Sequence, residues 1–355
     1  MQTLLSQLLR DSDEYTLWIA DENSKALLSA GIHFAGSLLS NRWDIVSAAE
    51  AIDIPARFCD FELGGEGKKY TRIIYPVSKE KAAVHHVINA AVETLQDGGE
   101  LLLLGEKSSG IKTYAQKAAA RLGSPKQLQK HGNDYLSTSV SHTGKAGAPL
   151  EDTDYTRLRQ PEGLEGLWSK PGLFGWNKTD VGSALLVREL PQCLPADNTA
   201  DFRVVDLGCG YGYLSTQLAS LLPSREKLYI QATDNNAAAI LACGKNFQAR
   251  NIHGTVTAGD AGSEIRTGTA QLVICNPPFH QGFQVEGDLT DRFLQQAARI
   301  LCPEGTALFV VNEFIPIGRK AERLFQKVEL LNKEQGFCVY RLTKSNIETV
   351  KYRAN

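Results

Sequence analysis

The sequence predicts two tandem α/β domains, each built on a doubly wound, mostly parallel sheet. Strand-like apolar runs alternate with helical stretches over residues 202–311, and such alternation is typical of parallel sheets. Residues 17–122 follow the same order at matching spacing. The length of 355 residues also exceeds what one hydrophobic core usually serves. Two copies of one fold are the simplest account of the chain.

Apolar periodicity places the elements of the second half. Strands are expected at 202–205, 228–232, 255–257, 272–275 and 307–311, and a final, antiparallel strand at 336–342. Helices are expected at 213–222, from 237 onward, and from 289 to 301. The glycine-rich loop and the polar turn described below both follow strands in this scheme.

The first half matches this plan strand by strand. The expected pairs are 17–21 with 203–206, 43–46 with the strand at 228, 72–76 with 272–277, and 99–105 with 305–311. Basic helical stretches are expected to follow the last pair, at 114–122 and 320–328. Residues 142–149 are rich in Gly and Ala and are followed by acidic and polar residues, which predicts a linker over 142–162 between domains at 1–141 and 163–355.

Composition limits the classes of partner and compartment. A net charge of -2 and a pI near 6.4 argue against a polyanion binder with a wholly basic surface. Basic clusters at 107–130 and 319–327 are each expected to form a solvated helix face. Seven scattered cysteines without metal-ligand spacing indicate reduced thiols and no metal, and no signal or membrane segment is recognisable. We therefore expect a cytoplasmic protein. We also expect a monomer.

A glycine-rich loop follows the first strand of the second half, at Asp206 to Gly212. Gly208, Gly210 and Gly212 let the backbone approach a nucleotide-like cofactor, and Asp234 follows at the distance of a ribose-binding acid. A dinucleotide dehydrogenase shares this pattern. Asp206 favours another cofactor, because an acid there would repel a pyrophosphate but suits an ammonium and a sulfonium charge. S-adenosylmethionine carries both, and Asp260 is a candidate acceptor for its adenine amine.

The segment 276–279, Asn-Pro-Pro-Phe, follows a buried strand and is the candidate catalytic turn. The side-chain carbonyl of Asn276 and the peptide carbonyl of Pro277 can accept hydrogen bonds from one amine, and Phe279 can stack on the flat ring that carries it. Two acceptors would direct the amine lone pair at a methyl group, so no separate base is needed. His280 is expected to shape the pocket.

These segments resemble the class I S-adenosylmethionine-dependent methyltransferases, and more narrowly the bacterial guanine-N2 methyltransferases of small-subunit ribosomal RNA. The string 276–280, the loop 206–212, the stretch 170–186 and the string 105–111 carry the resemblance. It implies a duplicated methyltransferase fold with a degenerate N-terminal copy, which agrees with the repeat and with the lack of a glycine loop after Asp21. It further implies that Phe174, Asp180 and Gly182 lie near the cofactor entrance, and that Phe174 contacts the substrate.

Three alternatives remain open at this level. The related guanine-N2 enzymes of large-subunit ribosomal RNA share Asn-Pro-Pro-Phe, although the string 105–111 favours the small subunit. Protein glutamine methyltransferases tend to carry Asn-Pro-Pro-Tyr, and Phe279 counts against them. A ribosome assembly factor could keep the fold without turnover. The chain departs from the small-subunit pattern at Tyr211 and at Trp176, which affects the expected shape of the pocket.

Overall fold

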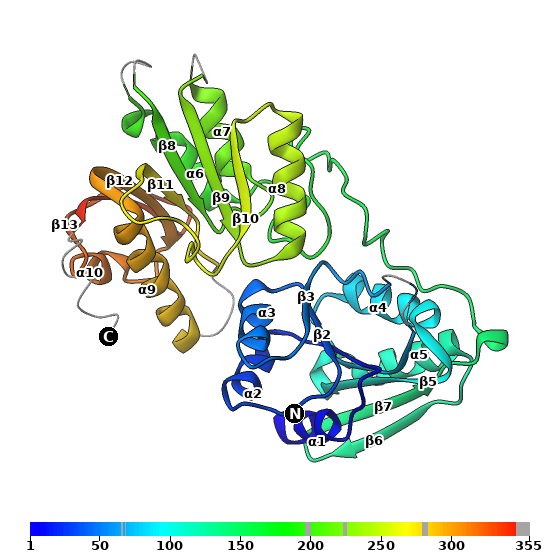
Figure 1. The fold of residues 1–355 in the computed structure, drawn as a ribbon. Helices are drawn as coiled ribbons and strands as arrows, with labels where there is room; N and C mark the ends of the chain where they lie inside the picture. The colour runs from blue at the N-terminus through cyan, green and yellow to red at the C-terminus, as the bar shows by residue number, and fades with distance from the viewer. Residues whose placement is uncertain (65–66, 68, 196–199, 223–225, 279–282, 346–355) are drawn as a thin grey trace. The chain divides into compact units, whose positions relative to one another are not determined.

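A computed structural model shows two compact units, Met1–Arg157 (unit 1) and Leu158–Asn355 (unit 2), and confirms the two α/β domains. It describes all residues except 65–66, 68, 196–199, 223–225, 279–282 and 346–355, and except the side chains of 283–288. Each unit contains one seven-stranded sheet (Figure 1). The boundary at Arg157 lies within the linker range expected from the sequence, 142–162.

Unit 1 alternates strands and helices before ending in two antiparallel strands. Its strands are β1 (Thr16–Ile19), β2 (Ser37–Ser40), β3 (Ala56–Phe58), β4 (Tyr70–Pro76), β5 (Leu95–Glu106), β6 (Gln127–His131) and β7 (Asp134–Val140). Its α-helices are α1 (Gln2–Arg10), α2 (Lys25–Ser29), α3 (Trp43–Glu50), α4 (Lys81–Thr94) and α5 (Ile111–Leu122), and short 3-10 turns are η1 (Glu22–Ser24), η2 (Lys107–Ser109) and η3 (Thr143–Lys145).

Unit 2 repeats this order. Its strands are β8 (Phe202–Leu207), β9 (Leu228–Asp234), β10 (Gly254–Ala258), β11 (Ala270–Cys275), β12 (Leu301–Asn312), β13 (Phe325–Glu334) and β14 (Phe337–Ser345). Its helices are α6 (Val181–Glu189), α7 (Tyr213–Leu221), α8 (Ala237–Ala249), α9 (Phe283–Ile300) and α10 (Ile317–Ala321), with the 3-10 turn η4 (Leu190–Cys193).

The two sheets share their strand order and an irregularity in their pairing. The orders are β3-β2-β1-β4-β5-β7-β6 and β10-β9-β8-β11-β12-β14-β13, and in each sheet one strand, β7 or β14, runs opposite to the other six. The pairing of β4 with β5 shifts between Tyr70 and Arg72, and that of β11 with β12 shifts between Ala270 and Leu272. An irregularity shared at one place supports duplication of a single fold.

The register fixes which residues of the two units correspond. Ile74 pairs with Trp18, and Ile274 pairs with Asp206. Each isoleucine lies four residues after the start of the shifted pairing, at Tyr70 in one unit and at position 270 in the other. Trp18 therefore occupies the position of Asp206.

The same count places Pro76 at the position of Asn276. The expected match of 17–21 with 203–206, which sets Asp21 against Asp206, is therefore wrong by three residues. Taking residues 75–77 as the counterpart of the Asn-Pro-Pro-Phe turn, which sets Tyr75 against Asn276, is wrong by one. The cause is that Asp21 lies beyond the end of its strand, whereas Asp206 lies within one. Chain-position matching could not detect this difference in strand length.

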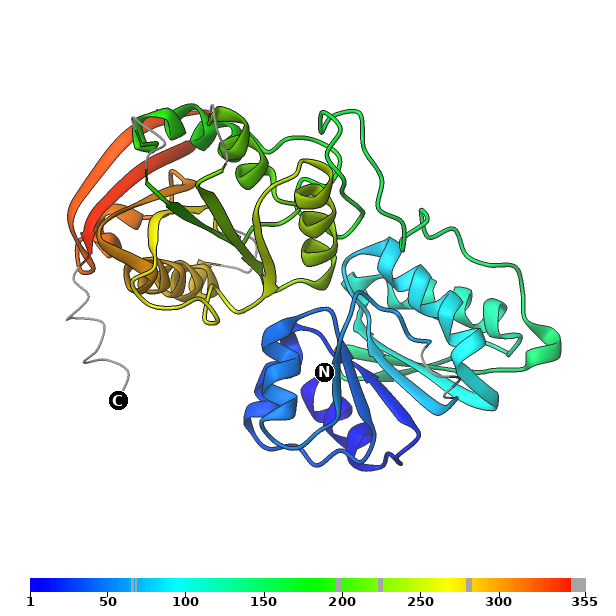
Figure 2. The same ribbon diagram turned by 45° about the horizontal axis from the view of Figure 1, so that its top comes forward.

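Helices cover both faces of each sheet (Figure 2). In unit 2, α6, α7 and α8 contribute buried residues to the core on one face, and α9 and α10 to the core on the other. In unit 1, α4 and α5 pack on one face and α1, α2 and α3 on the other. The carboxyl ends of the parallel strands are thus left for loops, which is where ligands bind in open α/β sheets.

Two expected elements are wrong. Residues 43–46 lie in helix α3, because Ile45, Val46 and Ala49 form a buried helical face, and the strand β2 precedes them. The basic stretch 320–328 is helical only to Ala321 and then enters strand β13. Strand β13 pairs with β14 in an antiparallel hairpin, so the expected antiparallel final strand is confirmed and gains a partner.

Residues 142–157 pack on unit 1. Arg121 on α5 donates to the backbone oxygen of Gly147 at 2.8 Å. Asn89 on α4 exchanges two hydrogen bonds with the backbone of Leu150, both at 2.8 Å. The Tyr155 hydroxyl donates to Asp60 at 2.8 Å. These bonds hold most of the expected linker range on the surface of one domain.

Candidate active site

Asp206 lies near the carboxyl end of β8 with a fully buried side chain. Its Oδ2 accepts hydrogen bonds from the hydroxyl and the backbone N–H of Ser215 on α7, at 2.6 and 3.2 Å. Its Oδ1 has no hydrogen-bond partner among the described residues. Burial, together with the charge of Asp234, raises the pKa of Asp206 to about 7, although the bonds from Ser215 oppose the shift. Such a carboxyl is suited to a cationic ligand.

The three glycines after β8 all have left-handed backbone. The φ angles of Gly208, Gly210 and Gly212 are 71°, 54° and 85°, a region that strains other residues. A Cβ on Gly212 would lie 2.8 Å from the sulfur of Cys243, so this glycine lets α8 pack against the loop. A Cβ on Gly210 would meet nothing within 4 Å, so the loop backbone there is open to a ligand.

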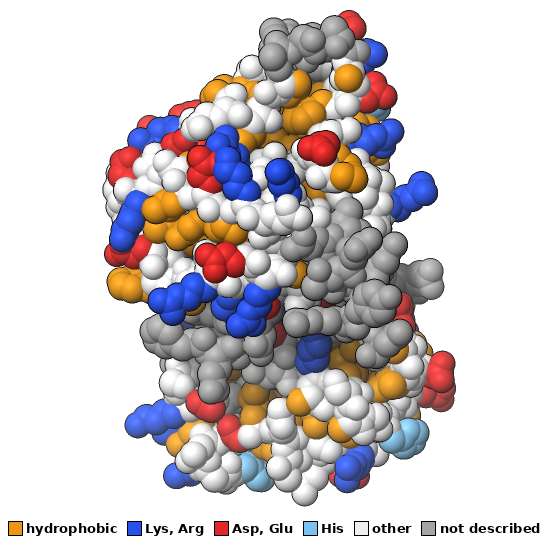
Figure 3. All heavy atoms as spheres, turned by 90° about the vertical axis from the view of Figure 1, so that its left-hand side faces the viewer, with side chains coloured by type: hydrophobic (Ala, Val, Ile, Leu, Met, Phe, Trp, Pro, Cys, Tyr) orange, Lys and Arg blue, Asp and Glu red, His pale blue; other side chains and the backbone are white. Residues whose placement is uncertain are grey.

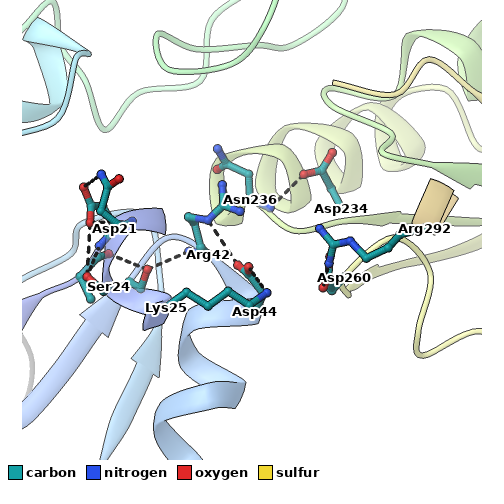
Figure 4. A network of polar contacts seen from close by, with 12 residues as sticks. Asp21, Ser24, Lys25, Arg42, Asp44, Asp234, Asn236, Asp260 and Arg292 are labelled. Carbon is teal, nitrogen blue, oxygen red and sulfur yellow. Dashed lines mark hydrogen bonds and ion pairs between the residues drawn. The ribbon is translucent and has the colours of Figure 1, made fainter. Parts of the chain in front are cut away.

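Asp234 ends β9 and braces the glycine loop. Its Oδ2 accepts from the backbone N–H of Gly210 at 2.9 Å. Its Oδ1 accepts from the backbone N–H of Asn236 at 2.9 Å (Figure 4). The first bond joins the second strand end to the loop, and the second lies at the start of α8. The two acids predicted for the cofactor, Asp206 and Asp234, thus border one loop.

Asp260 follows β10 and forms an ion pair with Arg292 of α9 (Figure 4). The side chains of Asp260 and Arg292 are 27% and 43% exposed. The pair is therefore partly screened by water. A ligand at Asp260 would share the carboxylate with the guanidinium of Arg292, a contact not predicted from the sequence.

Asn276 follows β11 directly, and its side-chain amide is held from one end. Its Nδ2 donates to Oδ2 of Asp180 at 2.9 Å and to Oγ of Ser183 at 2.7 Å. Its Oδ1 is buried and has no partner among the described residues. Pro277 is buried beside it. The arrangement leaves the Asn276 Oδ1 atom as a fixed acceptor, and the use of this oxygen and of the Pro277 carbonyl by a substrate amine stays a prediction.

The other predicted substrate contacts are described only in part. Phe279 and His280 lie outside the described residues. Phe174 lies in the segment that leads into α6, and its side chain is 58% exposed. Gly182, in the first turn of α6, is needed for packing, since a Cβ there would lie 2.8 Å from the ring of Phe337.

Sequence reasoning missed Ser183 and Asn246. Asn246 on α8 donates to the backbone oxygens of Trp168 and Tyr211, at 2.8 and 2.7 Å, and accepts from the N–H of Trp168 at 2.7 Å. One buried amide thereby ties the segment before α6 to the glycine loop. A buried asparagine within an Ala-rich helix was the available signal, since buried amides need partners.

Many side chains of the two basic clusters have partners within their own unit. Lys117 contacts His85 at 2.8 Å, and Lys320 pairs with Asp291 at 2.8 Å. Lys327 lies 3.3 Å from Glu329. On the face drawn in Figure 3, basic and acidic side chains are interspersed. These contacts agree with solvated surface clusters, although Lys130 and Lys327 lie on strands β6 and β13 and not on the expected helix faces.

The residues around the glycine loop fit S-adenosylmethionine. Asp206 offers an unused buried oxygen to a positive charge, and Gly210 offers open space beside the backbone. The described residues contain no group of three or more His, Cys, Asp or Glu side chains that could hold a metal. None of the described helices is long and apolar enough to cross a membrane. The unused oxygen of Asp206 and the open backbone at Gly210 are what suit the site to an organic, cationic cofactor.

Comparison with known proteins matches each unit to a domain family of methyltransferases. Residues 165–341 match the Methyltransferase small domain, and residues 16–130 match the Methyltransferase small domain N-terminal family. Ribosomal RNA small subunit methyltransferase C of Pseudomonas entomophila is 30% identical over 274 residues, which cover 77% of this chain and 78% of that protein. The chain belongs to the ribosomal RNA small subunit methyltransferase C family.

Further relatives of this methyltransferase C family match nearly the whole chain. The protein of the same name from Erwinia tasmaniensis is 28% identical over 346 residues, covering 95% of this chain and 96% of its own. The solved structure of the T. Thermophilus 16S rRNA N2 guanine methyltransferase RsmC, in complex with AdoMet and guanosine, has a TM-score of 0.77 at 22% identity. It covers 96% of this chain and 92% of its own, so the two proteins share both domains of the fold.

Proposed function

We propose that the chain transfers a methyl group from S-adenosylmethionine to the exocyclic N2 of a guanine in small-subunit ribosomal RNA. The observation that carries the proposal is the Asn276 amide, whose Nδ2 is engaged and whose buried Oδ1 is unused. The names of its relatives, which act on small-subunit ribosomal RNA, support this substrate over that of the large subunit.

Each residue of the site has a defined task in this proposal. Asn276 Oδ1 and the backbone oxygen of Pro277 accept the two N–H groups of the guanine amine and direct its lone pair. Phe279 stacks on the base, with Phe174 and His280 shaping the substrate side. When bound, S-adenosylmethionine supplies an electrophilic methyl group. The residues assigned to hold it are Asp206, Gly208, Gly210, Gly212, Asp234 and, at the edge, Asp260.

The reaction needs little acid or base from the protein. A guanine amine is a weak nucleophile because its lone pair is delocalised into the ring. Two carbonyl acceptors localise that lone pair toward the methyl group, and the proton leaves to water after transfer. A base within structured RNA must be extruded to reach the turn at Asn276. Unit 1 carries Trp18 and Pro76 at the matching positions, which supports a role in RNA contact or stability and not in chemistry.

The test is a methylation assay on isolated small and large ribosomal subunits. Asn276→Ala is expected to lower kcat by about 100-fold or more on small subunits, with cofactor affinity retained in a calorimetric titration. Asn332→Ala is the matched control, because it removes a hydrogen bond to Glu189 from an asparagine on β13. Near-normal activity of Asn276→Ala would remove Asn276 from the mechanism. Transfer to large subunits only would reassign the substrate.

A titration also separates the enzyme from a non-catalytic assembly factor. The wild-type chain is expected to bind S-adenosylmethionine, because the buried Asp206 oxygen and the open backbone at Gly210 have no other use among the described residues. Absence of binding would leave the assembly role as the better account. Mapping of modified nucleotides in ribosomal RNA from cells that lack the protein would identify the target guanine.

A further inference from the structure

Asp180, at the start of α6, contacts the catalytic turn from an element 96 residues away in sequence. We propose that Asp180 is a positioning residue that fixes the orientation of the Asn276 amide, so that Oδ1 and not Nδ2 faces the amine to be methylated. The inference rests on the proposed function of Asn276. Asp180 itself need not touch substrate or cofactor in this role.

Hydrogen-bond chemistry determines which end of the amide meets Asp180. Oδ2 of Asp180 accepts from the backbone N–H of Ser183 at 2.8 Å, so this oxygen is an acceptor. A carboxylate has no hydrogen to donate, and the Asn276 atom 2.9 Å away must therefore be the N–H₂ group. The second hydrogen of that group goes to Oγ of Ser183 at 2.7 Å. Both donors of the amide are used.

Ser183 alone could not set this orientation. Its hydroxyl can donate or accept, so it would satisfy either end of the Asn276 amide. Asp180 is the partner that discriminates, because a rotated amide would place Oδ1 against a carboxylate oxygen. The rotated amide would also present Nδ2 to the substrate amine, which is itself a donor, and the catalytic hydrogen bond would be lost.

Two other roles for Asp180 make different predictions. As a helix cap, it stabilises α6 through the bond from Ser183, and its removal would lower stability without a specific loss of turnover. As a counter-charge for a cationic cofactor, it would need its negative charge. A positioning role needs only an acceptor oxygen at the Oδ2 position, which an amide also provides.

The experiment compares Asp180→Asn with Asp180→Ala in the full chain. In Asp180→Asn the new carbonyl must still face the Ser183 N–H, so it keeps the contact with Asn276, and kcat on small subunits is expected within about 5-fold of wild type. In Asp180→Ala the Asn276 amide is free to rotate, and kcat is expected to fall by about 10- to 100-fold. The dissociation constant of S-adenosylmethionine is expected to change by less than about 3-fold in both.

Three outcomes would overturn the inference. Equal losses of turnover in Asp180→Asn and Asp180→Ala would show that the negative charge is required. A raised cofactor dissociation constant with kcat retained would make Asp180 a cofactor residue. An unchanged kcat in Asp180→Ala would leave helix capping of α6 as the only role of Asp180. Should Asp180→Ala not fold, Asp180→Ser keeps a capping hydroxyl that is too short for Asn276, and the same three readings apply.

The design separates this inference from the proposed function. If the wild-type chain methylates no guanine, the proposed function fails before any variant is compared. If it does, a double-mutant cycle with Asn276→Ala adds a check. A residue that acts only through Asn276 has no further effect on kcat once Asn276 is removed, whereas an independent role for Asp180 would lower kcat again.

Discussion

Units 1 and 2 have the same strand order and the same pairing irregularity, yet they differ at the ends of two central strands. Where unit 2 has Asp206 and Asn276, unit 1 has Trp18 and Pro76. Neither change interrupts its strand. The fold therefore forms without the polar residues of a cofactor or substrate site. The chemistry of unit 2 depends on Asp206 and Asn276, which the sheet accommodates but does not need for its stability.

The comparison is clearest at Trp18 and Asp206, which are both fully buried. Trp18 lies in an apolar core and meets Phe34 edge to face, with ring centroids 5.8 Å apart. Asp206 instead depends on Ser215 for two hydrogen bonds and leaves Oδ1 unused. A buried acid lowers the stability of the fold, so its presence needs a functional reason. For Asp206 in unit 2 that reason is the binding of a ligand.

The largest expected effect is the dependence of stability on pH that Asp206 causes, since unit 1 has the non-titrating Trp18 at the matching position. The folded pKa of Asp206, about 7, lies above its ordinary value of 3.8, so its favourable contribution is complete below pH 3.8 and is lost as the pH rises through 7. The full change is on the order of 4 kcal/mol, of which roughly 2.5 kcal/mol falls between pH 5 and 8.

Asp206→Asn measures this effect. Its free energy of unfolding in urea, minus that of the wild type, is expected to increase by roughly 2.5 kcal/mol from pH 5 to 8. Trp18→Phe, the matched change in unit 1, is expected to shift stability equally at every pH. Added S-adenosylmethionine should stabilise the wild type more at pH 8, because it favours the ionised carboxyl. A flat difference for Asp206→Asn would contradict the buried acid.

The glycine loop gives the next effect. Gly212→Ala combines a φ of 85° with a Cβ 2.8 Å from the sulfur of Cys243, and it is expected to destabilise the protein by about 2–3 kcal/mol. Gly244→Ala on α8 is the control, since nothing lies within 4 Å of its Cβ, and a helical Gly→Ala change stabilises by about 0.5–1 kcal/mol. Urea unfolding measures both, and equal effects would refute the packing argument.

The sequence predicted the fold of unit 2, and the strand ends at which the candidate site lies, for physical reasons. Apolar runs that end in Asp206 and before Asn276 identify strands whose carboxyl ends meet at one edge. The positive φ of all three loop glycines agrees with the role expected of them. Strand β13 was not predicted, because its residues are mostly half-exposed and carry the charges typical of a surface helix.

The remaining site contacts depend on tertiary structure. Nothing near Asp180 in the sequence indicates that it meets Asn276, and the sequence shows Ser183 only as a residue of a helix start. The match of Asp21 to Asp206 was wrong because strand register, which pairs Trp18 with Ile74, is set by packing across the sheet. Sequence patterns thus identify strand ends more readily than the side chains that hold them in place.

The smallest expected effect on cofactor binding concerns Asp260, whose structural counterpart in unit 1 is Asp60. Each acid lies two residues after the last strand residue of its sheet edge, at Phe58 and at Ala258. Asp60 is buried and accepts from the Tyr155 hydroxyl at 2.8 Å, and Asp260 pairs with Arg292. Both carboxylates thus have a protein partner, and Asp260, at the edge of the cofactor site, is expected to contribute less to cofactor binding than Asp234 does.

We therefore expect Asp260→Asn to change the dissociation constant of S-adenosylmethionine by less than about 5-fold and stability by less than about 1 kcal/mol, because the Arg292 pair is partly exposed. Asp234→Asn, at the end of the adjacent strand β9, is the matched control and should weaken binding more, since Asp234 braces Gly210 directly. Calorimetric titration of both variants decides the point. A loss at Asp260 as large as that at Asp234 would mean that the cofactor displaces Arg292, and would end the parallel with Asp60.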